Sequence, residues 1–298
     1  MKQIAILSGK GGTGKTSIAG AMGFIAENRA VLCDCDVDAS NLPLTTASKV
    51  IKTSDFSGGF AAEIDYSKCV SCGICAKVCR FDAVIKDSGS YQIQKNLCEG
   101  CGYCSVVCPV KAIRLTPVVS GSLSLSTSRF GSFIVHADLH TGAENSGKLS
   151  SQVRAMAREI AAIEEKDLII IDGPPGISCP AIAAISGADF VLFVAEPSQS
   201  GLSDYKRALE LSQKMRIPSG LVVNRADINP EITELLNRTA RQANSEVLGS
   251  IPFSDVFPRA LRSLKTVPEL QDCPTDILNT LKNLYHSITR PNTQGDYK

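Results

Sequence analysis

Residues 9–16 read Gly9-Lys10-Gly11-Gly12-Thr13-Gly14-Lys15-Thr16, and they lie between an apolar run at 2–8 and an Ala- and Gly-rich stretch at 17–27. This order predicts a strand, a glycine-rich turn and a helix from Ser17 to Glu27. The spacing G-x-x-x-x-G-K-[ST] is that of a phosphate-binding loop. Its backbone N–H groups and the positive end of the following helix attract phosphate oxygens. We expect Lys15 to reach the terminal phosphates of a nucleotide and the Thr16 hydroxyl to ligate Mg²⁺.

Eight of the twelve cysteines form two runs with the same spacing, C-x2-C-x2-C-x3-C. In such pairs, three thiolates of one run hold one [4Fe–4S] cluster and the fourth holds the other. A zinc site would need one close pair of thiolates and another distant pair, and a disulfide framework belongs to secreted chains. The spacing therefore predicts one cluster on Cys69, Cys72, Cys75 and Cys108, and a second on Cys98, Cys101, Cys104 and Cys79.

A lysine directly after the first glycine makes the loop more specific. K-G-G-x-G-K-T resembles the deviant phosphate loop of the MinD/ParA-type ATPases. That resemblance implies a homodimer on ATP binding, in which Lys10 reaches the phosphates of the facing subunit. It also implies that the nucleotide is bound by Gly9, Lys10, Gly11, Gly12, Thr13, Gly14, Lys15, Thr16 and Ser17.

Two aspartate motifs extend the resemblance. Residues 31–42 contain D-x-D-x(4)-N-L, which is similar to the first switch of the family, and imply that Asp36 orients the attacking water while Asp34 lies near Mg²⁺. Residues 168–171 are fully apolar and end at Asp172, as expected of a buried parallel strand that delivers a second Mg²⁺-linked carboxylate. The implied catalytic residues are Lys10, Lys15 and Asp36.

Two further segments resemble the base-binding parts of the family. Asn224 and Arg225 follow a buried strand, and the resemblance implies that the asparagine hydrogen-bonds adenine. Ile251-Pro252-Phe253 is similar to the loop that packs on the base, with Pro252 as the contact. The implied cofactors are ATP, Mg²⁺ and two [4Fe–4S] clusters.

The order of the motifs predicts a discontinuous ATPase domain at 1–61 and 118–290, an inserted two-cluster ferredoxin domain at 62–117, and a disordered tail at 291–298. The chain resembles MinD-superfamily ATPases with such an insert: an α/β, mostly parallel P-loop fold of the SIMIBI/MinD type carrying an α+β module. Alternating elements imply a sheet covered on both faces. We expect strands at 189–194, 217–223 and 246–250, helices at 149–165, 202–214, 230–244 and 275–289, and a hairpin of 122–126 with 133–137.

Composition limits the partners. The formal net charge is +1, which indicates no broad attraction to nucleic acid. No apolar run approaches the length of a membrane span, and residues 2–8 suit a core strand better than a signal peptide. Helix 275–289 has an apolar stripe with weak flanking charge, so we expect it to dock on the ATPase core without a stable membrane anchor. Thiolate-bound clusters fit a cytoplasmic location.

Three other cysteines and the stretch 144–148 have less specific roles. Cys179 follows the second switch and is either a small buried residue at a helix start or a ligand of a cluster shared between subunits. Cys33 and Cys35 flank Asp34, and we expect them to point to opposite faces of their strand, so that they cannot chelate together and serve as packing residues. The stretch 144–148 is either the capped start of a helix or a phosphate or partner contact through Lys148.

Three functions fit these features. The first is a slow, partner-stimulated dimeric ATPase that couples nucleotide state to electron transfer through the clusters to a partner protein. The second is a scaffold or carrier for a metal cluster, acting on a partner of the nitrogenase-cofactor-binding kind or with a paralogous ATPase. The third is a cell-division positioning ATPase with a redox sensor, disfavoured by the lack of a membrane helix.

Overall fold

The computed structural model describes residues 1–140, 143 and 147–290. These residues form two compact units. Unit 1 contains 1–53, 123–138 and the described residues from 147 onward; unit 2 contains 54–122 and the described residues of 139–144. The predicted tail, 291–298, and residues 144–146 lie outside the described residues.

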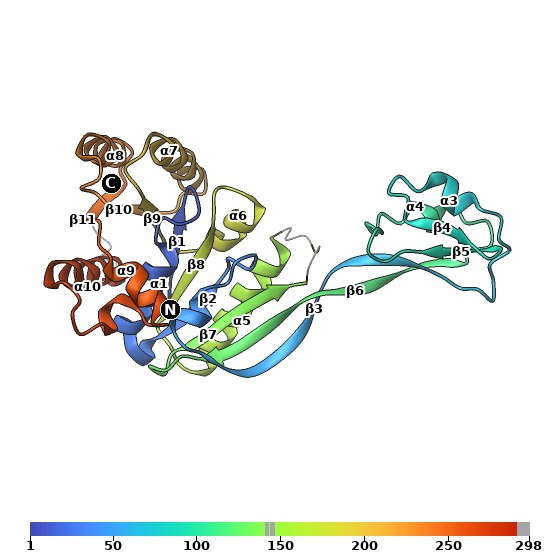
Figure 1. The fold of residues 1–298 in the computed structure, drawn as a ribbon, viewed down its shortest axis with the longest axis horizontal. Helices are drawn as coiled ribbons and strands as arrows, with labels where there is room; N and C mark the ends of the chain where they lie inside the picture. Colours follow the sequence, from blue (N-terminus) through green and yellow to red (C-terminus); the bar gives the residue numbers. More distant parts are fainter. Residues whose placement is uncertain (141–142, 144–146, 291–298) are drawn as a thin grey trace. The chain divides into compact units, whose positions relative to one another are not determined.

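Unit 1 is built on a mostly parallel sheet (Figure 1). The strand order is β11-β10-β9-β1-β8-β2-β7-β6-β3, and the pairs from β11 to β7 are parallel. This confirms the predicted α/β class and its mostly parallel sheet. The bounds are β1 Lys2–Ser8, β2 Ala30–Asp34, β3 Lys49–Ile64, β6 Ile113–Thr127, β7 Phe133–Leu139, β8 Leu168–Pro175, β9 Phe190–Ala195, β10 Ser219–Asn224 and β11 Glu246–Ile251.

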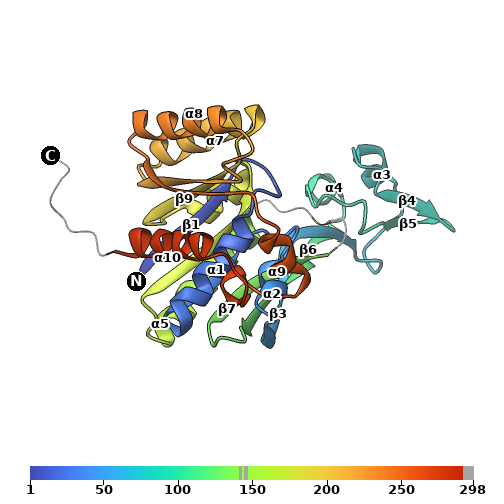
Figure 2. The ribbon, with the colours of Figure 1, turned by 60° about the vertical axis from the view of Figure 1, so that its left-hand side comes forward.

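Right-handed crossovers decide which helix covers which face of the sheet. The chain moves one way from β1 to β2 and the other way from β7 through β8 and β9 to β11, so α1 and the helices α5 to α8 lie on opposite faces. Figure 2 shows α10 beside α1, and α7 beside α8. The bounds are α1 Lys15–Ala26, α2 Leu42–Thr45, α5 Lys148–Ile163, α6 Cys179–Ile185, α7 Gln199–Lys214, α8 Pro230–Gln242, α9 Val256–Arg262 and α10 Thr275–Thr289, with 3₁₀ turns η1 Glu27–Arg29 and η2 Val267–Glu269.

The predicted helices and strands of the carboxyl half are confirmed to within three residues at each end. The first helix differs slightly, because it starts at Lys15 inside the phosphate loop and ends at Ala26. The apolar stripe of α10 is buried against α1 and the sheet, which confirms the predicted docking of this helix. Every residue of β2 and of β10 is buried, as expected for strands covered on both faces.

The predicted hairpin is present but forms part of longer strands. The turn between β6 and β7 is closed by a hydrogen bond from Ser128 N to Ser132 O (2.8 Å), and Ser126 contacts His136 across the pair at 2.9 Å. β6 begins at Ile113 and pairs with β3. No strand was predicted at the position of β3. Both long strands continue from unit 1 into unit 2.

Unit 2 is small and has a small apolar core. Its remaining elements are α3 Ile74–Val78, β4 Val84–Asp87, β5 Ser90–Ile93 and α4 Tyr103–Val106. β4 and β5 form an antiparallel hairpin. The buried centre consists of Ala62, Ile64 and Ile113, and five of the cysteines pack around it. So little apolar surface stabilises a domain weakly without a cross-link or bound group.

Candidate functional site

A cavity of about 640 Å³ opens at the carboxyl ends of the strands of unit 1. This volume lies within the range of small-molecule sites, and the carboxyl edge of a parallel sheet is where such folds bind ligands. The walls come from the loops after β1, β2, β8, β10 and β11. They include Gly11, Gly12, Gly14, Lys15, Thr16, Ser17, Asp36, Asp38, Asn41, Thr45, Pro174, Pro175, Asn224, Arg225, Phe253 and Phe257.

The phosphate loop is held by a residue from a distant strand. Asn224 at the end of β10 donates a hydrogen bond from Nδ2 to Thr13 O at 2.8 Å. Gly14 has φ 101°, and a Cβ there would lie 2.6 Å from the same Nδ2. Only glycine fits this conformation and this contact. The loop thereby delivers Lys15 and the first N–H groups of α1 to the cavity.

Asp34 ends β2, and Asp172 lies within the neighbouring β8, opposite Asp34 in the register. Asp34 accepts hydrogen bonds from Ser40 Oγ (2.8 Å) and Leu42 N (3.2 Å), so its carboxylate orders the loop after β2. Both oxygens of Asp172 are buried without a hydrogen-bond partner. Burial raises the pKa of Asp172 to about 6, and burial together with the Asp172 charge raises that of Asp34. A divalent cation would compensate both effects.

Asp36 lines the cavity and Lys15 lies close enough to act on it electrostatically. Burial raises the pKa of Asp36, and the Lys15 charge opposes that increase. A carboxylate so placed can accept a hydrogen bond from a water beside a bound phosphate.

Lys10 is paired within its own chain. Its ammonium group forms an ion pair with Glu196 and donates to Ser200 Oγ at 3.2 Å. Glu196 also pairs with Arg225 at 3.3 Å, and Arg225 donates to Gly12 O. One carboxylate after β9 therefore holds two of the predicted nucleotide-binding cations. No motif marked Glu196 in the sequence.

The predicted site residues fall into two groups. The cavity wall contains Gly11, Gly12, Gly14, Lys15, Thr16, Ser17, Asp36, Asn224 and Arg225. The residues Gly9, Lys10, Thr13, Asp34, Asp172 and Pro252 lie outside this wall among the described residues; at the predicted base end Phe253, Phe257 and Leu261 line the cavity. Of these, Phe257 and Leu261 on α9 were missed by sequence reasoning, since an amphipathic helix gives no ligand signal.

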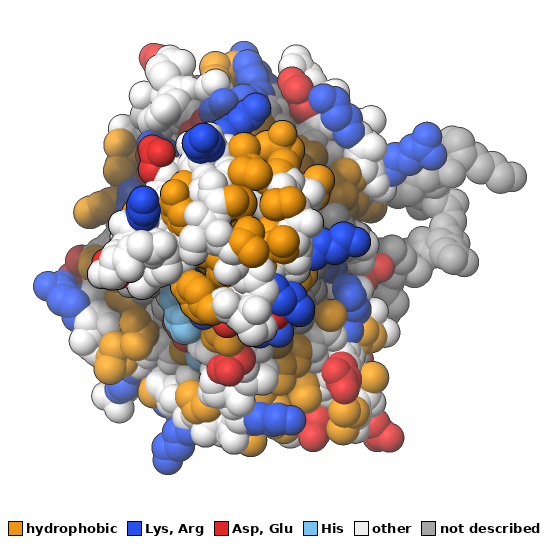
Figure 3. All heavy atoms as spheres, turned by 90° about the vertical axis from the view of Figure 1, so that its right-hand side faces the viewer, with side chains coloured by type: hydrophobic (Ala, Val, Ile, Leu, Met, Phe, Trp, Pro, Cys, Tyr) orange, Lys and Arg blue, Asp and Glu red, His pale blue; other side chains and the backbone are white. Residues whose placement is uncertain are grey.

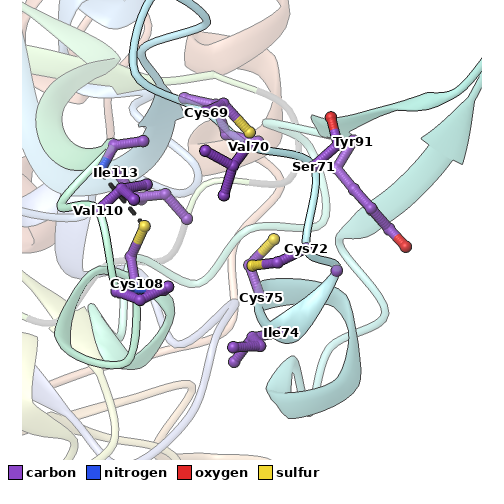
Figure 4. A pocket seen from close by; sticks show the side chains of 14 residues that line it. Cys69, Val70, Ser71, Cys72, Ile74, Cys75, Tyr91, Cys108, Val110 and Ile113 are labelled. Carbon is purple, nitrogen blue, oxygen red and sulfur yellow. Dashed lines mark hydrogen bonds between the residues drawn. The ribbon is translucent and has the colours of Figure 1, made fainter.

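The cysteines of unit 2 gather around two smaller cavities. One is lined by Cys69, Cys72, Cys75 and Cys108, and the other by Cys79, Cys98, Cys101 and Cys104. Each cavity therefore combines three thiols of one run with the last thiol of the other. Figure 4 shows the four sulfur atoms of the first cavity pointing into the space between α3 and the turn at Cys108.

The two cavities have the chemistry of soft-metal sites. Their other walls are mainly apolar, and backbone N–H groups donate to sulfur, from Ala112 to Cys108 at 3.2 Å and from Ala62 to Cys98 at 3.4 Å. Burial raises the pKa of the Cys75 and Cys104 thiols. Among the described residues, no three His, Cys, Asp or Glu side chains converge as they would on a single metal ion. Thiolates that bind different corners of a cube lie further apart than those around one ion.

The predicted orientation of Cys33 and Cys35 was wrong, whereas their predicted packing role is confirmed by their complete burial. Residues two apart on a strand share a face, and the two sulfur atoms lie 3.6 Å apart in the core of unit 1. The hydrogen bond with Cys33 and burial raise the pKa of Cys35. Cys179 starts α6 and is exposed, which excludes the buried packing role; a bridging role remains a prediction.

Comparison with known proteins gives the family. The profile described as the CobQ/CobB/MinD/ParA nucleotide binding domain matches residues 4–267. The chain belongs to this family. As a MinD/ParA-family member it is a P-loop ATPase.

This MinD/ParA-family chain is also similar to individual proteins. It is similar to the uncharacterized protein MJ0578 of Methanocaldococcus jannaschii, with 32% identity over 96% of each chain. Its fold resembles that of the septum site-determining protein MinD with Mg-ADP from Pyrococcus horikoshii (TM-score 0.56, 16% identity, 97% and 96% of the two chains covered). It also resembles an McdA–ATP complex from Cyanothece (TM-score 0.58, 19% identity, 97% and 96% covered). Within residues 1–140, 143 and 147–290, none of the helices has the length and apolarity that crossing a bilayer requires.

Proposed function

We propose that this MinD/ParA-family ATPase is a dimeric switch whose nucleotide state controls electron transfer to a partner protein through two [4Fe–4S] clusters held by unit 2. The observation that carries the proposal is the pair of cavities in unit 2, each lined by three thiols of one run and one of the other. Two bound clusters would supply one-electron redox chemistry. The ATPase unit supplies the switch.

The residues of the nucleotide site suit phosphoryl transfer to water. Lys15 and the N–H groups at the start of α1 bind phosphate oxygens, and Thr16 with Asp172 would hold Mg²⁺, which neutralises phosphate charge. Asp36 orients the attacking water. The described wall holds two carboxylates, Asp36 and Asp38, and no histidine, and we expect slow hydrolysis that a partner stimulates.

The loop after β2 provides a short mechanical route toward unit 2. Asp34 fixes Ser40 and the start of α2 through hydrogen bonds, and β3 starts at Lys49, soon after α2 ends. Arg129, in the turn between β6 and β7, donates to Thr45 O at 3.0 Å and through its N–H to Thr46 O at 3.2 Å. Both long strands are therefore anchored, within unit 1, to the segment beside the nucleotide.

The ion pair between Lys10 and Glu196 gives the switch a resting state. If Lys10 binds the phosphates of a facing subunit, it must first leave Glu196. Nucleotide binding also competes for Arg225, which lines the cavity and shares the same carboxylate. Dimer closure therefore exchanges an internal ion pair for contacts across the interface.

An anaerobic redox titration followed by EPR tests the proposal, with and without Mg²⁺-ATP and with dimer formation measured in parallel. A change of cluster potential or of reoxidation rate on ATP binding supports gated electron transfer. Clusters that do not respond to nucleotide would exclude gating and leave ATP to control partner docking alone.

A second candidate is a scaffold that delivers a cluster. It is favoured by the exposure of Cys72 and Cys101, one at each cavity, because exposed ligands can be exchanged with an acceptor. Incubation of the iron-loaded chain with an apo-acceptor protein distinguishes the two. Iron transfer that depends on ATP supports the scaffold, and retained iron supports the electron carrier.

A further inference from the structure

The first cysteine cavity of unit 2 has an apolar mouth. Val70, Ile74, Pro109 and Val110 line the cavity and are exposed, Val70 to 61%. Contiguous apolar side chains at the surface of a small domain are unfavourable in water unless a partner covers them. We call these four residues the Val70 patch.

Two lysines flank the Val70 patch. Lys77 lies three residues after Ile74 on α3 and therefore on the same side of the helix, and Lys111 follows Val110. Both are exposed, and in the described part of the chain neither forms an ion pair with a carboxylate. Figure 3 shows apolar side chains gathered on a face of unit 2, with Lys and Arg at their border.

The second cysteine run gives an internal comparison on the same scaffold. Counting from its first cysteine, Glu99 occupies the position of Val70, and Val106 occupies that of Lys77. Glu99 lines the second cavity, whereas the described lining of the first contains no acidic residue. The second cavity is also lined by exposed apolar side chains, Phe81 and Tyr103, so the first mouth differs in lacking an acidic residue and in having Lys77 where the second run has Val106.

We propose that the Val70 patch is the docking surface for an acidic redox protein, with Lys77 and Lys111 attracting its rim. This inference rests on the proposed electron-transfer function and names the surface and chemistry of the partner. Weak electron-transfer complexes use small interfaces, and charges of one sign around an apolar centre speed and orient the encounter. Cys72 is exposed at this mouth, so a docked partner lies close to the first group of thiols.

The test measures binding of the iron-loaded full-length chain to an acidic flavodoxin by calorimetry, at low and at high salt. We expect binding that weakens as salt rises. The double variant Lys77→Glu/Lys111→Glu should weaken it by about tenfold or more, as expected for lost complementary charges. Val70→Asp should weaken it comparably, and iron content measured on the same sample separates loss of docking from loss of the first cluster.

Lys86→Glu/Lys95→Glu is the matched control, because it changes the net charge equally at exposed residues that do not line the first cavity. It should change the affinity by less than about threefold. An equal loss in both double variants would overturn the docking site, since net charge alone would explain it. So would absence of wild-type binding to flavodoxin, binding to vesicles with anionic lipid instead, or self-association through the patch seen by light scattering.

The outcomes separate this inference from the proposed function. Suppose that the wild-type chain holds its clusters and responds to ATP, and that Lys77→Glu/Lys111→Glu binds flavodoxin as tightly as the wild type does. The proposed function then stands, and the docking surface is refuted. If instead the clusters do not respond to ATP but flavodoxin binding still depends on Lys77 and Lys111, the docking surface stands and the ATP-gated function is refuted.

Discussion

Lys10 of the phosphate loop is held by Glu196 of the same chain, a residue that follows β9. Ser200 and Arg225 complete the cluster. The lysine that the family resemblance assigns to the facing subunit is thus neutralised internally. In the proposed ATP-bound dimer, this pairing would have to break before the two subunits close.

Glu196→Gln should therefore promote dimerisation. A partly exposed ion pair contributes about 0.5–1 kcal/mol, so the ATP concentration for half-maximal dimer formation should fall about two- to fivefold. Light scattering during an ATP titration measures this. Glu210→Gln, an exposed change on α7, is the control and should have no effect. Unchanged or weaker dimerisation of Glu196→Gln would mean that Glu196 stabilises the closed form.

Lys15→Ala should remove nucleotide binding. The Lys15 side chain is buried and lines the cavity, and a charge-assisted hydrogen bond to phosphate contributes about 2–3 kcal/mol. We expect about a 30- to 150-fold loss of ATP affinity in equilibrium binding. Lys10→Ala should still bind ATP as a monomer, because its pairing lies outside the cavity wall. Similar losses in both variants would contradict these separate roles.

Asp36→Ala should bind ATP normally and accumulate as an ATP-bound dimer. Loss of the residue that orients water should reduce hydrolysis by about 100-fold or more. Phosphate release and light scattering in the same sample report both properties. Normal hydrolysis by Asp36→Ala would refute the role assigned to this carboxylate.

Cys72→Ser should lower the iron content from about 8 to about 4 per chain, since only one cube loses a ligand. Unit 2 should be destabilised because its apolar core is small. ATP binding by unit 1 should be unaffected, which checks that the chain still folds. Cys273→Ser, far from both cavities in sequence, should keep all the iron. Full retention of iron by Cys72→Ser would refute the crossed assignment.

Glu269→Gln should alter the pH dependence of stability. Burial alone would raise the pKa of Glu269, but hydrogen bonds from Arg129 and Thr266 lower it. A lowered pKa stabilises the fold above the unfolded value of about 4.5, and this contribution is lost as pH falls through the folded value. The variant should be less stable than wild type by about 1 kcal/mol at pH 7.

The difference between Glu269→Gln and wild type should shrink below pH 4. Urea unfolding at pH 7 and pH 3.5 measures both values. Glu246→Gln, an exposed carboxylate on β11, should show no such change. A difference that is equal at both pH values would indicate loss of packing rather than loss of charge.

Local patterns predicted the parallel part of the fold well. The glycine spacing of the loop, the continuous apolar run before Asp172 and the helical apolar stripe of α10 are all local signals, and each forms the expected element. β3 was not predicted. All of its first seven residues are exposed, so the strand shows no alternation of buried and exposed side chains there. Its strand character comes from pairing with β6, which is distant in sequence.

The candidate site was predicted where a motif is contiguous. The walls formed by Gly12, Lys15 and Asp36 follow from such motifs. Glu196 could not be found in this way, because its role depends on a side chain that is 186 positions away in the sequence and close only in the fold. The orientation of Cys33 and Cys35 was predictable from strand geometry alone, because residues two apart on a strand point to the same face.

The strand order of unit 1 also has a consequence for synthesis. β1 carries the phosphate loop, and its neighbours in the sheet are β8 and β9. A growing chain finishes both cysteine runs at Cys108, yet β1 gains its second neighbour only once Ala195 has left the ribosome. Domains generally fold as units in the order in which they emerge. The eight thiols of the proposed cluster sites are therefore all present in a nascent chain that is still unable to bind nucleotide.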